Sequence, residues 1–526
     1  MEVAGVVAGL RRVTARTTPP AGTPSPRRDW LLRVPAAIGA GVALYFSFPP
    51  YQFWWLAPIA IAVYGLVLHE RSKRAATGYS LLFALSFFLL HLLWLQDFLG
   101  RDLGPWPWLG LSLVMALYLT AAGALMPLVA RLPAAPVWLA LLFVLSEAVR
   151  GRFPYGGFPW GKLAFGQVEG PLLGLAALGG VPLVSFAVAL LGFSLSALIL
   201  RARTTVSARG WVGLAIPVVL PVVAALAAWP LVGVEAQTGT RTIAVVQGNA
   251  PDVGIRLLGE LPTIRRNHLQ TSRELAAAIR AGTSPKPDLV VWPESTTGFN
   301  GPDPTIDAAV AELGVPTLIG GLYRVPAGQE NAYVSWDPVT GQGPRYVKQQ
   351  LVPFSEFIPL REIARLFSPF TDNADLIAGT RPGVLTAAGT PLGVAICYEV
   401  AYDYVLRENV DNGAQLLIVP TNNAWFGRGD MTYQQLAMAR LRAVEHGRAV
   451  VVAATSGVSA TIRPDGTVLR SLDMYTPGTL TETLPLRTST TIADRLGRWT
   501  EIAMVLLALL AVAAGIRRGV RERRAD

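Results

Sequence analysis

The chain has 526 residues, of which 52% are hydrophobic and 15% charged, and this composition excludes an ordinary soluble protein. We attribute its net charge of +10 to Lys and Arg flanking membrane spans and expect no nucleic-acid partner, because no basic stripe alternates with aromatic residues. One cysteine excludes an intrachain disulfide and a thiolate-rich metal site, and the four histidines lack ligand spacing, so we expect no metal and no other cofactor.

The N-terminal half of the chain is a series of apolar segments. Residues 1–30 are rich in Arg, Thr and Pro and predict a disordered tail. Most of the segments that follow approach the ~20 residues that cross a hydrocarbon core. Since lipid offers no hydrogen bonds to the backbone, each segment should be a helix. The predicted spans are 31–48, 52–69, 77–98, 106–131, 135–150, 181–200 and 211–233, with an eighth at 499–516.

Basic residues predict how the spans are oriented. Lys and Arg gather at both chain ends and in the loops 70–76 and 201–210, which share one side if eight helices alternate. The loops near 49–51 and 99–105 hold only Arg101. We therefore expect both termini in the cytoplasm, with the segment between the seventh and eighth spans outside it.

Five regions follow from this pattern. They are a cytoplasmic tail at 1–30, a seven-helix region at 31–233, an extracytoplasmic domain at 234–498, a last helix at 499–516 and a basic tail at 517–526.

The segment 234–498 alternates strand-like and helical patterns, which predicts one α/β domain with a buried core. The predicted strands are 242–247, 288–292, 317–320, 394–397, 416–420 and 450–454. The predicted helices are 262–281, 402–412 and 431–446.

Three short segments of this domain place reactive side chains beside strand-like runs. Glu294 follows an apolar run, and taken alone it is as well explained by a helix cap. Lys348 lies between apolar residues, where a lysine can simply protect an edge strand from pairing. Cys397 follows a β-type run just before a predicted helix, where backbone N–H groups favour the thiolate, although most free cysteines are small buried core residues.

Together the three residues supply a complete nucleophilic mechanism. A thiol nucleophile needs a base to take its proton and a cation to hold the oxyanion that forms. The order Glu294, Lys348, Cys397 resembles the Glu-Lys-Cys triad of the nitrilase-like carbon–nitrogen hydrolases.

Longer motifs resemble one branch of that superfamily, the apolipoprotein N-acyltransferases, over about residues 31–516. The motifs are Val246-Gln-Gly-Asn249, Trp292-Pro-Glu294, Lys348-Gln-Gln-Leu-Val-Pro-Phe-Ser-Glu356-Phe-Ile-Pro359, Cys397-Tyr-Glu399, Asn423-Ala-Trp-Phe-Gly427 and Phe158-Pro-Trp160. The resemblance implies a transmembrane bundle of about eight helices with an extracytoplasmic α-β-β-α sandwich of the nitrilase type.

The resemblance also implies roles for the triad. Glu294 would be the general base and Cys397 the acylated nucleophile. Lys348 would stabilise the oxyanion together with the backbone N–H after the cysteine.

Five further residues match supporting positions of the family. Glu356 would hold or assist the lysine, and Tyr398 and Glu399 would be essential neighbours of the nucleophile. Trp425 and Phe426 would lie near the acyl pocket.

The implied reaction transfers a fatty acyl group from a membrane phospholipid, through a thioester, to the N-terminal amine of a diacylated apolipoprotein. The implied location is a bacterial cell membrane, and we expect a monomer. The sequence departs from the family at 252–258, where many members carry a tryptophan and this chain has Arg256 instead.

Three other interpretations remain open at this stage. A membrane-tethered nitrilase-type amidase would share the triad and let water resolve the thioester. A non-catalytic lipid binder would be expected to have lost a triad member. A transporter would place ionisable residues inside its spans, and Glu147 is the candidate there.

Overall fold

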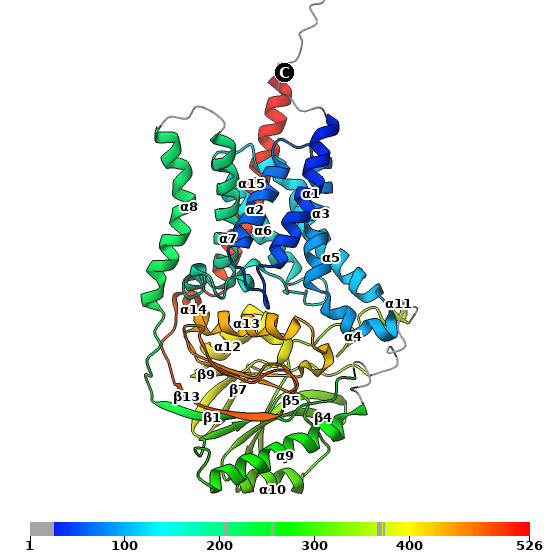
Figure 1. Cartoon of the computed structure of the whole chain (residues 1–526), viewed down its shortest axis with the longest axis vertical. Coiled ribbons are helices and arrows are strands. Elements are labelled where there is room, and N and C mark those ends of the chain that lie inside the picture. Colours follow the sequence, from blue (N-terminus) through cyan, green and yellow to red (C-terminus); the bar gives the residue numbers. More distant parts are fainter. Residues whose placement is uncertain are drawn as a thin grey trace, which may run out of the picture.

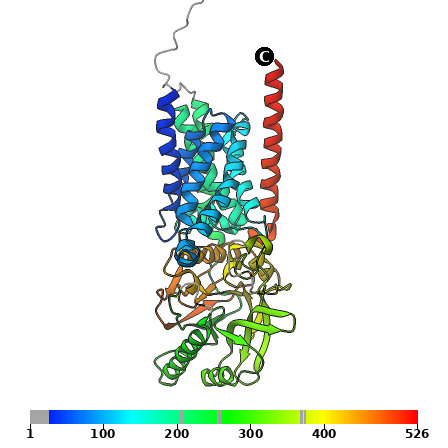
Figure 2. The same ribbon diagram turned by 90° about the vertical axis from the view of Figure 1, so that its right-hand side faces the viewer.

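The structure, a computed structural model, describes residues 26–202, 208–253, 257, 259–365, 371 and 374–525. A bundle of helices stands on an α/β domain, and the last helix, α15, runs along one side of the bundle (Figures 1 and 2). The bundle helices are α1 Pro26–Tyr45, α2 Leu56–Leu68, α3 Lys73–His91, α4 Trp94–Leu103, α5 Trp106–Val129, α6 Ala135–Arg150, α7 Ala176–Arg201, α8 Ala208–Ala228 and α15 Trp499–Ala525.

Each of the predicted apolar segments contains a helix. Within the described ranges, three helical segments are long and apolar enough to cross a membrane: Trp106–Val129, Pro171–Arg201 and Trp499–Arg524. The pair α3 and α4 passes the same test jointly, which gives four if this bent pair is one broken span. The number eight therefore stays a prediction.

The segment 77–98 is not the continuous helix that was expected, because it is broken after His91. Helix α3 ends at His91, and α4 follows it at a 59° bend. The polar residues Gln96 and Asp97 are poorly suited to lipid, and the rings of α4 pack on the α/β domain instead. The Trp94 ring, for example, lies 5.1 Å from the Phe426 ring, centroid to centroid.

The first predicted boundary also shifts. Helix α1 begins at Pro26, so the last residues of the expected tail 1–30 are helical, while residues 1–25 lie outside the described part.

Two β-sheets lie face to face in the α/β domain. Within the described residues, one sheet has seven strands in the order β13-β1-β2-β4-β5-β6, with β3 beside β4, and the other has six in the order β12-β11-β10-β9-β8-β7. The strands are β1 Thr240–Gln247, β2 Leu289–Val291, β3 Thr297–Phe299, β4 Thr317–Val325, β5 Gly328–Asp337, β6 Gly341–Val347, β7 Val384–Ala387, β8 Thr390–Val394, β9 Leu416–Thr421, β10 Val450–Ala454, β11 Ala460–Ile462, β12 Val468–Ser471 and β13 Gly478–Pro485.

Helices cover the outer faces of both sheets. The helices of the domain are α9 Leu261–Arg280, α10 Pro304–Leu313, α11 Arg361–Ala364, α12 Asp403–Asp411, α13 Met431–His446 and α14 Ile492–Leu496. Because alternate side chains of a strand point to opposite faces, Ile243 and Val245 of β1 pack between the sheets. Ala244 and Val246 pack with residues of α9 and α10 on the other side. The layers are therefore α-β-β-α, as the resemblance implied.

The strand predicted at 394–397 is wrong, because β8 ends at Val394 and Cys397 begins a 3₁₀ turn, η6 Cys397–Ala401. Seven strands were not predicted at all: β3, β5, β6, β7, β11, β12 and β13. Several of them are partly exposed, such as β6 and β12, and lack the apolar runs that marked the central strands.

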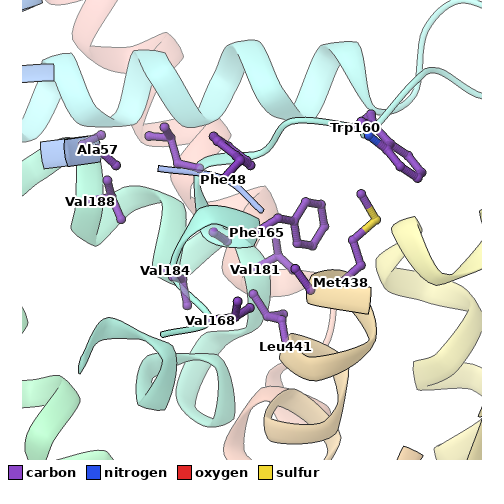
Figure 3. Packing of buried hydrophobic residues seen from close by; sticks show 14 of the residues in the cluster. Phe48, Ala57, Trp160, Phe165, Val168, Val181, Val184, Val188, Met438 and Leu441 are labelled. Carbon is purple, nitrogen blue, oxygen red and sulfur yellow. The ribbon is translucent and has the colours of Figure 1, made fainter. Parts of the chain in front are cut away.

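The bundle and the second sheet share one hydrophobic core. Leu417 of β9 and Met438 and Leu441 of α13 belong to the same buried cluster as Phe165 and Val181 of the bundle. Figure 3 shows Met438 and Leu441 beside these bundle residues. Each such side chain stabilises the contact by about 1.5–3 kcal/mol on full burial, so the cluster fixes the domain to the bundle.

A buried ionic network reinforces this contact. Arg442 of α13 is fully buried and donates to the carbonyls of Val400, at 2.9 Å, and Ala401, at 3.0 Å, which end η6. It also donates to Asp403 Oδ1 at 2.7 Å, and Asp403 Oδ2 accepts from Lys162 Nζ of the bundle at 2.9 Å. The turn that begins at Cys397 is thus tied to the bundle through one arginine and one lysine.

Replacing Arg442 by Ala should lower the free energy of unfolding by roughly 3–5 kcal/mol, because Asp403 loses one cationic partner and Glu445 loses its arginine in a buried site. Thermal unfolding in detergent measures the loss. Arg463→Ala, which breaks the more exposed pair with Asp465, is the control and should cost about 0–1 kcal/mol. Equal losses in the two variants would contradict this account of the network.

Candidate active site

The two sheets bring the predicted triad together at their strand ends. Glu294 lies three residues after β2, Lys348 directly follows β6, and Cys397 lies three residues after β8. Thr421 is the last residue of β9, which runs parallel to β8. Carboxyl ends of parallel strands meet at one edge of a sheet and commonly form binding sites there.

The Lys348 ammonium group lies between two carboxylates. Its Nζ donates to Glu294 Oε1 at 3.0 Å and to Glu356 Oε1 at 2.9 Å, and the lysine side chain is 1% exposed. Asn331 Nδ2 donates to the same two oxygens, each at 2.8 Å. Burial lowers the pKa of Lys348, but the charges of Glu294 and Glu356 outweigh it and raise that pKa well above its usual value. Lys348 is therefore a fixed positive charge at neutral pH.

The second oxygen of each carboxylate is held by the backbone. Asn422 N donates to Glu294 Oε2 at 3.0 Å, and Val352 N donates to Glu356 Oε2 at 2.8 Å. Both carboxylates therefore have fixed orientations. The bond from Asn422 also links Glu294 of the first sheet to the chain just after β9 of the second.

Cys397 occupies a strained backbone position. Its φ is +52°, in the left-handed region that non-glycine residues rarely adopt. The residue is 7% exposed, and Thr421 Oγ1 lies 3.2 Å and Gln435 Nε2 3.7 Å from its Sγ. Thr421 Oγ1 is also 3.0 Å from Gln435 Oε1, so its single proton can serve only one of these acceptors at a time.

The expectation that local N–H groups favour the thiolate is wrong for the free protein. Burial, followed by the charge of Glu294, raises the pKa of Cys397 to about 12, although the Lys348 ammonium and the Thr421 hydroxyl act to lower it. Cys397 is therefore a thiol at neutral pH. Removal of its proton must accompany the attack on a substrate, which gives a neighbouring carboxylate a chemical task.

Glu399 anchors the two sides of the site to each other. Its Oε1 accepts from Gln349 N at 2.7 Å and Gln350 N at 3.0 Å, just after Lys348, and its Oε2 accepts from Ile396 N at 2.7 Å. The Tyr346 hydroxyl lies within 3.0 Å of both oxygens. Burial raises the pKa of Glu399 to about 7, although these hydrogen bonds and the charge of Lys348 lower it.

Tyr398 points toward the bundle. Its hydroxyl donates to Gly157 O at 3.1 Å, and its ring stacks on Phe158 and Trp160, with centroids 6.0 and 6.4 Å away. Trp160 Nε1 donates to Gln434 of α13 at 2.6 Å. The Phe-Pro-Trp motif thus contacts the residue next to Cys397 and lies in the same loop region as the network around Lys162.

Trp425 and Phe426 lie on the turn η7 Asn423–Phe426, directly after Asn422. Their rings pack against α4: the Phe98 ring lies 5.9 Å from the Trp425 ring and 5.6 Å from the Phe426 ring. The departure at Arg256 lies outside the described residues. The described residues contain no group of three or more His, Cys, Asp or Glu side chains arranged to hold a metal ion.

The side chains of Asn331, Thr421 and Gln435 contact the reactive groups of the triad, and these residues were not singled out from the sequence. Thr421 ends a strand whose run was predicted, and that position was a usable signal. Asn331 lies inside β5, which was not predicted, and Gln435 lies on a correctly predicted helix where no sequence pattern indicates which face meets the thiol.

The chain matches two family models, described as "Apolipoprotein N-acyltransferase N-terminal domain" over residues 40–194 and "Carbon-nitrogen hydrolase" over residues 331–494. An apolipoprotein N-acyltransferase from Mycolicibacterium smegmatis is 38% identical over 507 residues, covering 91% of this chain and 84% of that one. The chain belongs to the apolipoprotein N-acyltransferase family. The resemblance drawn from the motifs is therefore confirmed, as is the carbon–nitrogen hydrolase type of the α/β domain.

A second relative bears the same family name. An apolipoprotein N-acyltransferase from Photobacterium profundum is 29% identical and covers 89% of this chain and 92% of its own. Among solved structures, an amidase from Nesterenkonia sp. aligns with 49% of this chain and 94% of its own, at 22% identity and a TM-score of 0.35.

Alkylation of Cys397 by iodoacetamide should be slow at pH 8. Its rate should still increase about tenfold per pH unit above pH 9, because only the thiolate reacts. The alkylation rate of the native protein, measured as a function of pH, tests this. The denatured protein is the control, because its cysteine should have the pKa of an ordinary thiol. Glu294→Gln should shift the native profile to lower pH, since it removes a negative charge that raises the pKa. A native rate that levels off below pH 9 would show that the thiolate forms in the resting site.

Proposed function

We propose that this chain transfers a fatty acyl group from a membrane phospholipid to the α-amine of a diacylglyceryl-cysteine at the N-terminus of a lipoprotein, through a thioester on Cys397. The observation that carries the proposal is the buried cluster of Glu294, Lys348 and Glu356, whose charges act on the thiol of Cys397. In a member of the apolipoprotein N-acyltransferase family, this arrangement supplies a nucleophile, a base and a cation at one place.

In the first step, Cys397 Sγ attacks the ester carbonyl of the phospholipid while Glu294 takes the thiol proton. The carbonyl oxygen becomes an oxyanion, which the Lys348 ammonium stabilises together with the backbone N–H of Tyr398. The tetrahedral intermediate then expels the alcohol, to which Glu294 returns the proton. A lysophospholipid leaves, and the acyl group remains as a thioester.

In the second step, the free amine of the lipoprotein attacks the thioester carbonyl. Glu294 accepts a proton from the amine as the C–N bond forms, and the proton returns to the sulfur as the C–S bond breaks. The products are an N-acylated lipoprotein and the free thiol. Glu356 fixes Lys348, and Glu399 with Tyr398 holds the turn that carries the nucleophile in place.

Burial of the site suits this chemistry. A thioester is open to hydrolysis, and a thiol that is only 7% exposed is largely shielded from water. Lipid must therefore displace covering side chains to reach the sulfur. Phe354, Leu360 and Ile363 are exposed apolar residues after Lys348, at 64%, 59% and 54%, and they suit a rim that faces lipid. We assign Trp425 and Phe426 to the acyl pocket behind this rim.

We further propose the topology that the basic loops indicate. Eight spans would place both termini in the cytoplasm and the α/β domain, at 234–498, outside it, where lipoproteins are matured. The tails at 1–30 and 517–526, the seven-helix region at 31–233 and the last span at 499–516 complete this arrangement. The working unit would be a monomer, since the proposed site is built from one chain.

The second candidate, a membrane-tethered amidase, uses the same triad with water as the acceptor. An apolar bundle that shares a core with the catalytic domain argues for substrates anchored in lipid, and so for the transferase.

Incubation of the purified protein with phospholipid alone should add the mass of one acyl group to Cys397, and mass spectrometry of the intact protein and its peptides checks this. Addition of a diacylated lipopeptide should then move the acyl group to the peptide amine. Cys397→Ser and Cys397→Ala should abolish transfer while the protein still folds and inserts, because neither supplies the thiol.

The Thr283→Ala variant, altered in a loop remote from the site, is the control and should retain transfer. An active Cys397→Ala enzyme, or release of the acyl group only as free fatty acid, would contradict the proposal.

A further inference from the structure

A cavity of about 300 Å³ lies at the junction of the bundle and the α/β domain, away from the triad. It is lined by residues at the end of α6, the break in α7, α12, α14 and the start of α15, and Figure 1 shows α14 at this junction. Neither Glu294, Lys348 nor Cys397 lines it. The volume is at the lower end of the ~300–1,000 Å³ typical of ligand pockets.

Each acidic residue of this cavity has a basic partner. Asp403 pairs with Lys162 and Arg442, and Glu501 pairs with Arg152. The remaining two acids, Glu445 and Asp494, pair with Arg442 and His446.

Two cationic side chains of the cavity have no such partner. Arg407 and Arg498 both line it, and neither forms an ion pair within the described part of the chain. Arg407 is half-buried, and Arg498 lies over the Trp499 ring at 5.5 Å. Because the acids are already paired, these two guanidinium groups leave the cavity suited to an anion with several oxygens.

A buried histidine provides an independent sign of a ligand. His446 lines the cavity and is 1% exposed, and its Nδ1 lies 2.6 Å from Asp494 Oδ1. The carboxylate can only accept, so Nδ1 carries a proton. The Nε2 atom has no hydrogen-bond partner, and Glu445 Oε2 lies 3.8 Å from it. Buried polar atoms are normally paired, so this one indicates a ligand group such as a hydroxyl, which can donate or accept.

The position of the cavity indicates where the ligand comes from. Helix α15 begins at Trp499, which is 61% exposed, and the apolar segment Trp499–Arg524 can cross a membrane. Exposed tryptophan and arginine at the start of such a helix are typical of the membrane–water interface. The cavity therefore opens at the level where lipid headgroups lie.

We propose that this cavity binds the headgroup of an anionic glycerolipid, with its phosphate on Arg407 and Arg498 and a headgroup hydroxyl hydrogen-bonded to His446 Nε2. The site is separate from the thioester chemistry, so it does not depend on the proposed reaction. The cavity does adjoin the active site, because Gln350 lines the cavity and its backbone N–H donates a hydrogen bond to Glu399. A bound headgroup would therefore steady the segment that follows Lys348.

The test measures binding to the full-length Cys397→Ser protein in detergent, which cannot consume lipid. Three probes are compared by the shift in melting temperature over a titration: short-chain phosphatidylglycerol, glycerol 3-phosphate and a short-chain diacylglycerol. We expect saturable binding of phosphatidylglycerol and none of diacylglycerol. Glycerol 3-phosphate binding as tightly as the lipid would keep the phosphate site but identify its occupant as a soluble phosphate.

Arg407→Gln and Arg498→Gln should each weaken phosphatidylglycerol binding by at least about tenfold, since each removes a charge-assisted hydrogen bond. Arg495→Gln is the matched control on α14, where the arginine is exposed and does not line the cavity, and it should bind normally. Arg498 is exposed, so its variant keeps the test valid if Arg407→Gln folds poorly. The proposal would be overturned if both cavity variants bound phosphatidylglycerol with unchanged affinity. It would also be overturned if the control lost as much affinity as they do.

Discussion

The structure depends on one buried ammonium group placed between two carboxylates. Burying Lys348, Glu294 and Glu356 costs a large desolvation penalty, which the contacts of 2.9 and 3.0 Å and the two bonds from Asn331 offset. The three residues follow β2 and β6 of one sheet, whereas Cys397 follows β8 of the other. The cluster therefore sets the electrostatic field in which the thiol lies, and removal of Lys348 would leave two buried carboxylates without their cation.

The bundle and the catalytic domain act as one body because they share a core and an ionic network. Arg442 holds the end of the turn that Cys397 begins, Lys162 reaches Asp403 from the bundle, and Tyr398 stacks on the loop before α7. Cys397, the proposed nucleophile, is thus positioned by elements that also pack against the apolar helices. The proposed transfer between two lipid-anchored substrates would need this arrangement, since it requires a fixed distance between the sulfur and the membrane.

Part of the site was predictable because Glu294 and Cys397 follow apolar strand runs. Lys348 follows β6, which has no such run, and it was identified because the order of Glu294, Lys348 and Cys397 resembles a known triad. Helices α9, α12 and α13 were predicted to within a residue or two, because their ends carry clear turn residues. The bend after His91 could not be predicted, since it depends on Trp94 packing against Phe426, far along the chain. The raised pKa of Cys397 was not predicted either, because it results from burial by both sheets rather than from its neighbours in sequence.

The central claim is that Glu294 and Lys348 act on Cys397 as one unit. The most direct measurement is a double-mutant cycle on the rate of thioester formation. The full-length protein is mixed with phospholipid, and the reaction is stopped at short times by rapid quenching. Lys348→Met alone should lower the rate of thioester formation by about 10²–10³-fold, as expected when one oxyanion donor is removed. The double variant Glu294→Gln/Lys348→Met should be about as slow as the slower single variant, because the effects of substituting residues that act as one unit are not additive. Losses that multiply in the double variant would show that the two residues act independently and would contradict the account.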